Sequence, residues 1–242
     1  MFSLLLSLSV GVVITVALLL ADLMHPAISV LLGSLAFAGV YAVVLRQVML
    51  KINAAVEGVQ KDLAAQRIEK AIRVIEDVQK KFGPWQFYVK QQMNSQIGSI
   101  YYLKRDFSKA FDYLNQGFGR HWVGMGMLAI CYMKRNQNGK MTETFEKAVT
   151  LTRKEPLLWT LYAFCLEKVG DRAKAIQVME RGLKKVKGDE QMQENLQLLQ
   201  EGKKLKMQPY GDMWLQFHLE KTGTLMRLHT KAIQGRRKMV IR

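Results

Sequence analysis

Two long uncharged apolar runs at the start of the chain restrict its fold more than any other feature. Residues 1–20 and residues 27–45 contain no charged side chain. About 20 helical residues are enough to cross a hydrocarbon core of about 30 Å. Between the runs lie Asp22, His25 and Pro26, which suit a short exposed turn. We therefore expect an N-terminal hairpin of two transmembrane helices.

Two other interpretations of these runs are possible. A cleaved signal peptide would have a basic segment before its apolar core and a shorter core, and no second apolar run would follow at once. Two helices of a soluble protein would carry a polar stripe, which neither run has. The second run also contains small residues that would let two helix backbones approach closely. These residues are Gly33, Ser34, Ala36, Ala38 and Gly39.

The basic residues are confined to the later part of the chain. All 36 Lys and Arg residues follow Leu45, and the net charge is +16. The turn between the runs has none, whereas Arg46, Lys51 and Lys61 follow the second run closely, so the positive-inside rule places that side in the cytosol. We expect an integral protein of a bacterial inner membrane, with both termini and the soluble part in the cytosol.

The soluble part has the pattern of helices throughout. Apolar residues recur every three or four positions from Lys51 to about Leu205, and no alternating strand pattern persists. The stretch 80–84 (KKFGP) combines basic residues, Gly and Pro, which is typical of a helix end. The predicted fold class is therefore all-α. We expect a juxtamembrane helical linker at 46–61, a helical domain at 62–205 and a basic amphipathic tail at 206–242.

An internal repeat of 34 residues runs through the helical domain. Leu128-Ala129, Tyr132, Phe145 and Ala148 return in the same order as Tyr162-Ala163, Leu166, Met179 and Gly182. The spacing and the alternation of large and small residues resemble the tetratricopeptide repeat (TPR) family. The best single match is the turn Val169-Gly170-Asp171, with similar turns beginning at Arg105 and Arg135.

The resemblance implies an α-solenoid of about three helix pairs from Trp85 to Gly188. Residues 62–82 would form a preceding half-repeat, and residues 189–205 a capping helix. In this family the first helices of successive pairs line a concave groove that binds a peptide or a helix. Such a protein would be a membrane-anchored scaffold or adaptor. The residues that the resemblance places in the groove are Tyr102, Ile130, Met133, Lys134, Phe164 and Lys168.

The residue types of this groove indicate the chemistry of its ligand. Aromatic and aliphatic side chains lie beside two lysines, so we expect an apolar protein segment flanked by acidic residues. An alternative is that Tyr102, Ile130 and Phe164 pack against the chain's own C-terminal segment, which is rich in large apolar residues. Those residues are Met213, Trp214, Phe217, Leu225 and Leu228.

A function of a different class is binding through the basic tail. The aromatic residues Trp214 and Phe217 near several basic residues resemble an interfacial amphipathic helix more than a base-reading element. Anionic lipid is therefore favoured over nucleic acid, and a merely solvated tail is the third possibility. The residues expected to contact the membrane are Trp214, Phe217, Arg227, Lys231, Arg236, Arg237 and Lys238.

The sequence offers little support for catalysis. Its four histidines are scattered, and no group of residues has metal-ligand spacing. Cys131 and Cys165 are 34 residues apart, so they occupy equivalent repeat positions, where we expect buried thiols that act as small apolar side chains. We therefore predict that the protein is not an enzyme and holds neither a cofactor nor a metal.

Overall fold

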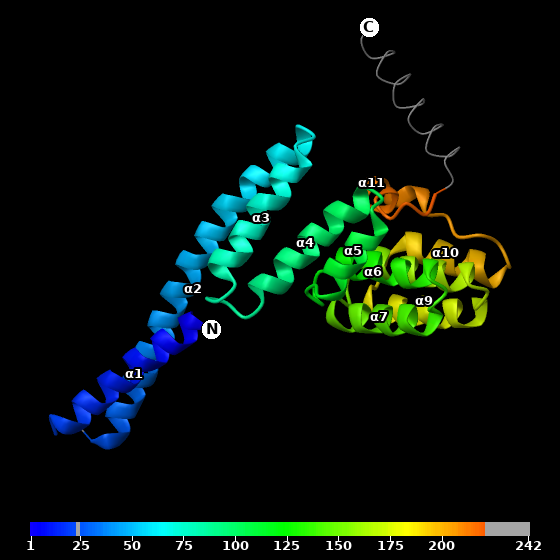
Figure 1. The fold of residues 1–242 in the computed structure, drawn as a ribbon. Helices are drawn as coiled ribbons and strands as arrows, with labels where there is room; N and C mark the ends of the chain where they lie inside the picture. The colour runs from blue at the N-terminus through cyan, green and yellow to red at the C-terminus, as the bar shows by residue number, and fades with distance from the viewer. Residues whose placement is uncertain (23–24, 221–242) are drawn as a thin grey trace, which may run out of the picture. The chain divides into compact units, whose positions relative to one another are not determined.

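A computed structural model describes residues 1–22 and 25–220, and all regular structure in these residues is helical. The all-α prediction is therefore confirmed for this part of the chain. The chain divides into two compact units after Gly124. The first holds α1 (Phe2–Leu20), α2 (Pro26–Ala64), α3 (Ile68–Phe82), α4 (Val89–Leu103) and α5 (Phe107–Asn115) (Figure 1).

The helix α6 (Trp122–Lys134) runs from the end of the first unit into the second. The second unit then continues with α7 (Asn138–Leu151), α8 (Pro156–Lys168), α9 (Arg172–Lys185), α10 (Glu190–Gln200), the 3₁₀ helix η1 (Gln208–Tyr210) and α11 (Asp212–Leu215) (Figure 1).

Small residues form the contact between α1 and α2. The buried positions of α1 are Ser3, Ser7 and Gly11, spaced by one helical turn. A Cβ atom built on Gly11 would lie 2.8 Å from the Cβ of Phe37 and 3.0 Å from the backbone oxygen of Gly33, so any side chain there would separate the helices. The expected close approach is confirmed at Gly33, whereas a Cβ atom on Gly39 would meet nothing within 4 Å.

Many large apolar side chains of both helices are exposed, among them Leu5, Val13 and Leu35. Only 17% of the most apolar stretch of α1 is buried within the protein, and only 11% of the most apolar stretch of α2. The core helix of a soluble protein would be mostly buried. Small residues inside and large apolar residues outside are the arrangement of helices that pack in lipid. Both helices are long and apolar enough to span a membrane.

The second of these helices is much longer than a membrane is thick. It has 39 residues and would extend for about 58 Å at 1.5 Å per residue. The predicted linker at 46–61 is thus the second half of α2. There Val48, Ile52 and Val59 are buried in a core shared with α3 and α4. The apolar run at 27–45 and the segment that packs on α3 are therefore parts of one continuous helix.

One turn geometry recurs between the helices. Gln66, Arg105, Asn136 and Gly170 have φ values of 62°, 63°, 56° and 91°, in the left-handed region. In the last of these turns the N–H of Asp171 donates to the Leu166 carbonyl at 2.9 Å. The same bond to the fifth preceding residue closes the other three turns, as in the Schellman motif.

These turns separate α2 from α3, α4 from α5, α6 from α7 and α8 from α9. The three that the sequence predicts, near Arg105, Arg135 and Gly170, are confirmed, as is the end of α3 at Phe82. The turn at Gln66 is not predicted by the sequence, because residues 64–68 contain no glycine or proline. Four helix hairpins of the same local geometry follow one another along the chain.

Candidate functional site

The C-terminal segment of the described chain lies along the helices of the second unit. We call residues 205–217 the strap. Where the strap begins, the Lys206 N–H donates to Oδ1 of Asn195 at 2.7 Å, and Nδ2 of Asn195 donates to the Lys206 carbonyl at 3.1 Å. The Asn195 side chain is fully buried in α10. A buried amide that pairs with both backbone groups of one residue fixes the position of the strap.

The middle of the strap lies on α8. The hydroxyl groups of Tyr210 and Thr160 are 2.9 Å apart and share a hydrogen bond, and Thr160 is fully buried. Four residues further along the strap, the ring of Trp214 packs edge-on against Phe164, with 4.8 Å between the ring centroids. The strap thus follows one face of α8 for more than a helical turn.

The end of the strap reaches α6. A Cβ atom built on Gly126 would lie 3.2 Å from Cε1 of Phe217, so the missing side chain leaves room for this ring. Phe217 is completely buried, and Trp214 is 1% exposed. These two aromatic residues are the anchors of the strap in the surface formed by α6 and α8.

A cleft remains open beside the strap. It has a volume of about 730 Å³ and is lined by Phe164, Lys168 and residues of the strap and its flanks, among them Lys204 and Met207. The ammonium group of Lys168 lies 5.8 Å from the centroid of the Phe164 ring. The cleft therefore combines an apolar wall with exposed positive charge.

The structure places the six predicted groove residues differently from one another. Tyr102 belongs to the first unit, where its side chain is fully buried and its ring lies edge-on to Phe107 at 5.2 Å. Ile130 is also fully buried in the second unit, and Met133 is 9% exposed. Tyr102 and Ile130 are therefore buried in cores, whereas the sequence analysis places them in a groove that binds a partner.

Phe164, Lys168 and Lys134 fit the predicted surface better. Phe164 is half-buried under the strap, while Lys134 and Lys168 are exposed. Together with Met133, the two lysines line a second cleft of about 450 Å³ near His218. In this structure the face formed by α6 and α8 is covered by the chain's own strap.

The residues predicted to contact the membrane also divide into two sets. Trp214 and Phe217 are enclosed by protein, so they are not placed as interfacial side chains. In the described part of the tail, up to residue 220, Trp214 lies in the four-residue helix α11, and no long amphipathic helix includes it. Arg227, Lys231, Arg236, Arg237 and Lys238 lie outside the described residues.

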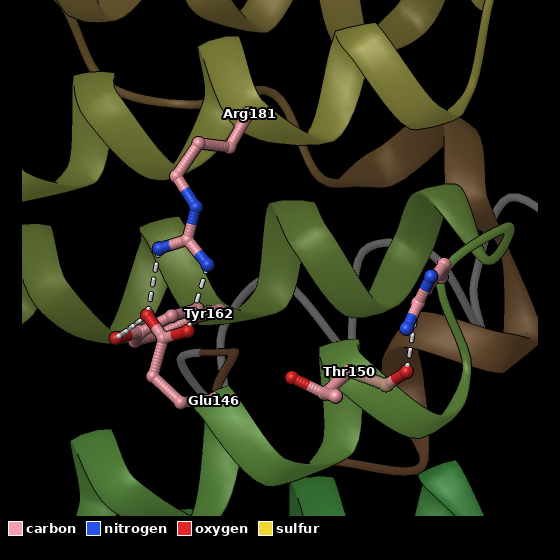
Figure 2. A network of polar contacts seen from close by, with 5 residues as sticks. Glu146, Thr150, Tyr162 and Arg181 are labelled. Carbon is pink, nitrogen blue, oxygen red and sulfur yellow. Dashed lines mark hydrogen bonds and ion pairs between the residues drawn. The ribbon is translucent and has the colours of Figure 1, made fainter.

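A polar network connects α7, α8 and α9. Arg181 of α9 donates two hydrogen bonds of 2.9 and 2.8 Å to the carboxylate of Glu146 on α7, and the Tyr162 hydroxyl of α8 donates a third at 3.1 Å (Figure 2). The Tyr162 ring also stacks on Phe145 at 4.8 Å. The carboxylate of Glu146 thus links α7, α8 and α9 through hydrogen bonds.

This network makes the stability of the second unit depend on pH. The hydrogen bonds from Arg181 hold the pKa of Glu146 below its usual value. Because the folded pKa is the lower one, the stabilisation is present above about pH 4.3, the ordinary pKa of a glutamate, and is lost as the pH falls through the folded pKa. Since both partners are partly exposed, we expect Glu146→Gln to cost less than about 1 kcal/mol at pH 7.

The measurement is chemical unfolding of wild type and variant at several pH values. The difference between them should shrink below pH 4, and Glu143→Gln, at an exposed site on the same helix, should show no such dependence. A constant difference between Glu146→Gln and wild type across this range would argue against the charge-assisted network.

The two cysteines are buried, as expected. Cys131 is 2% exposed and Cys165 is fully buried. Burial raises the pKa of the Cys131 thiol to about 11 and that of Cys165 to about 12. Both are therefore thiols of low reactivity. Within residues 1–22 and 25–220, no cluster of His, Cys, Asp and Glu has the arrangement of a metal site.

No protein-family model matches the chain, and the search of curated proteins found no match either.

Proposed function

We propose that this chain is a membrane-anchored scaffold of TPR-like helix hairpins, which holds a protein segment at the cytosolic face of a membrane. The two apolar helices α1 and α2, which contact each other through small residues, would supply the anchor. A repeat architecture is supported by four turns of the same geometry, at Gln66, Arg105, Asn136 and Gly170. The observation that carries the binding role is that the surface of α6 and α8 already holds a peptide segment, the strap.

The contacts at the start of α1 support the proposed topology. The Phe2 N–H donates to the Pro84 carbonyl at 3.0 Å, and Pro84 lies in the connection between α3 and α4. The first residues of α1 are therefore on the same side as the α3–α4 connection of the first unit. The excess of Lys and Arg after residue 45 supports the proposal that this side faces the cytosol.

The strap indicates what an external ligand would look like. Its anchors, Trp214 and Phe217, are three residues apart, so they lie on one side of a short helical turn. Exposed Lys134 and Lys168 border the same surface. We infer that the partner presents an apolar or aromatic segment with acidic flanks, and that it competes with the strap for α6 and α8.

Binding of anionic lipid through the basic tail is the second candidate function, and fewer residues support it than the sequence suggests. Because Trp214 and Phe217 are enclosed in the second unit, attraction to anionic lipid would rest on the basic residues alone. Charge reversal at Arg236, Arg237 and Lys238 should then weaken the binding of the chain to anionic lipid in a salt-dependent way.

Site-specific photocrosslinking in native membranes tests the scaffold proposal. A photoreactive residue at Lys168 should crosslink to a partner, and the yield should rise when Trp214→Ala and Phe217→Ala release the strap. The same probe at Lys147, an exposed position on α7, is the matched control. Equal crosslinking at both sites, or a yield that falls when the strap is released, would contradict the proposed competition.

A further inference from the structure

The connection between α3 and α4 is bound to the start of α1, more than 80 residues earlier in the chain. Ser3 Oγ donates to the Trp85 carbonyl at 2.6 Å, and the rings of Phe2 and Trp85 lie edge-on with 6.1 Å between their centroids. With the hydrogen bond from Phe2 to Pro84, these contacts fix the connection at one end of α1.

The length of α1 sets the depth of this end. Its 19 residues would extend for about 28 Å at 1.5 Å per residue, close to the thickness of a hydrocarbon core. If α1 spans a membrane, its whole length is needed to cross the hydrocarbon core. Phe2 then lies at the boundary between hydrocarbon and headgroups. The residues that contact Phe2 lie at that boundary as well.

The pairing of α1 with α2 leads to the same depth. Gly11 packs between Gly33 and Phe37 of the antiparallel partner. The start of α1 lies nine residues before Gly11. In an antiparallel pair it is therefore level with residues about nine beyond that contact, which are residues 42–46 and include Arg46. Since Arg46 is the first charged residue after the second apolar run, this level is the edge of the membrane.

The connection presents aromatic side chains at this level. Trp85 is 37% exposed and Phe87 is 71% exposed. Lys80, Lys81 and Lys90 are exposed around them. Tryptophan is enriched at membrane interfaces, and lysine near the surface is attracted to anionic headgroups. An exposed phenylalanine is unfavourable in water, and the adjacent membrane boundary removes that cost.

We propose that Trp85 and Phe87 form a lipid contact that seats the α3–α4 connection in the headgroup region of the same membrane. This inference rests on the proposed membrane anchor. It adds a contact with lipid headgroups to the attachment that the two apolar helices of the first unit provide.

Spin labelling of the full chain in liposomes containing anionic lipid tests the contact. Labels are introduced at cysteines replacing Val13, Phe87 or Leu103, all three of which are exposed, and the buried native cysteines should stay unlabelled. The readout is the ratio of collisions with oxygen to collisions with a water-soluble nickel chelate, which rises with depth. At residue 87 this ratio should be severalfold higher than at Leu103, which lies at the far end of α4, and lower than at Val13.

The control at Val13 separates the two possible failures. A low ratio at Val13 would refute the membrane anchor itself. A high ratio at Val13 with equal low ratios at residues 87 and 103 would leave the anchor standing and overturn the lipid contact. An interaction of Phe87 with a protein instead of lipid would give the latter result.

A second measurement leaves the aromatic residues in place. A label at Lys90 reports on the same connection, and Phe87→Asp should move it toward water, whereas Leu103→Asp should not. A label at Lys90 that responds equally to both substitutions, or to neither, would also overturn the contact.

Discussion

Phe217→Ala is expected to lower the free energy of unfolding of the second unit by about 3–5 kcal/mol, the usual cost of removing a buried aromatic side chain. The Phe217 ring is completely buried against Gly126, so its removal leaves a cavity between the strap and α6. Trp214→Ala should have an effect of the same size, because Trp214 is 1% exposed and packs on Phe164. Hydrogen exchange of the full chain followed by mass spectrometry measures the loss of protection.

The matched control is Met213→Ala in the same short helix. Met213 is 47% exposed, and substitutions at such sites usually stay within about 0.5 kcal/mol. Exchange also shows how the effect is distributed. If the strap detaches as a separate segment, residues 205–217 lose protection first and α8 retains most of its own. Equal protection in Met213→Ala, Phe217→Ala and wild type would show that the strap does not stabilise this surface.

The features that could be predicted from the sequence are those set by local chemistry. Charge-free runs define the two apolar helices, and the Gly170-Asp171 pair defines a turn because glycine adopts positive φ without strain. The helix hairpins could be predicted for a similar reason, since their apolar residues recur at the helical period.

The turn at Gln66 and the continuity of α2 depend on tertiary packing. No residue between Leu45 and Ala64 stops a helix, so only the burial of Val48, Ile52 and Val59 shows that this segment belongs to the helical domain. Gln66 adopts positive φ although glycine would do so more easily. A turn of that kind leaves no compositional trace in the sequence.

The candidate site could be predicted only in part, because it depends on which side of each helix is covered. A shift of one residue in phase turns a helix by about 100°, which is enough to move Ile130 from a groove to a core. The sequence analysis leaves self-occupation of the groove open as an alternative. The position of Trp214 on Phe164 supports that alternative for the face formed by α6 and α8.

The hairpin itself should give an all-or-none result in thiol labelling. In sealed membrane vesicles of known orientation, a cysteine replacing Ala21 is expected to react with an impermeant maleimide only from the side opposite the cytosol. One replacing Lys61 should react only from the cytosolic side. Both positions are exposed, and the native cysteines are buried with raised pKa values. The neighbouring turn residue Leu23 lies outside the described residues.

The size of the expected effect follows from the cost of moving charge across the membrane. The turn carries no Lys or Arg, whereas Arg46, Lys51 and Lys61 would have to cross if the hairpin were inverted, and each basic residue at the centre of a membrane helix costs about 2.5–3.5 kcal/mol on insertion scales. Val13→Cys is the control for burial in lipid and should react from neither side. Reaction of the Ala21 and Lys61 variants from the same side would exclude a hairpin that spans the membrane, and exchange of their two sides would invert the topology. The hydrogen bond from Phe2 to Pro84 keeps the start of α1 beside the α3–α4 connection. An inverted hairpin would therefore place the helical domain on the side opposite the cytosol.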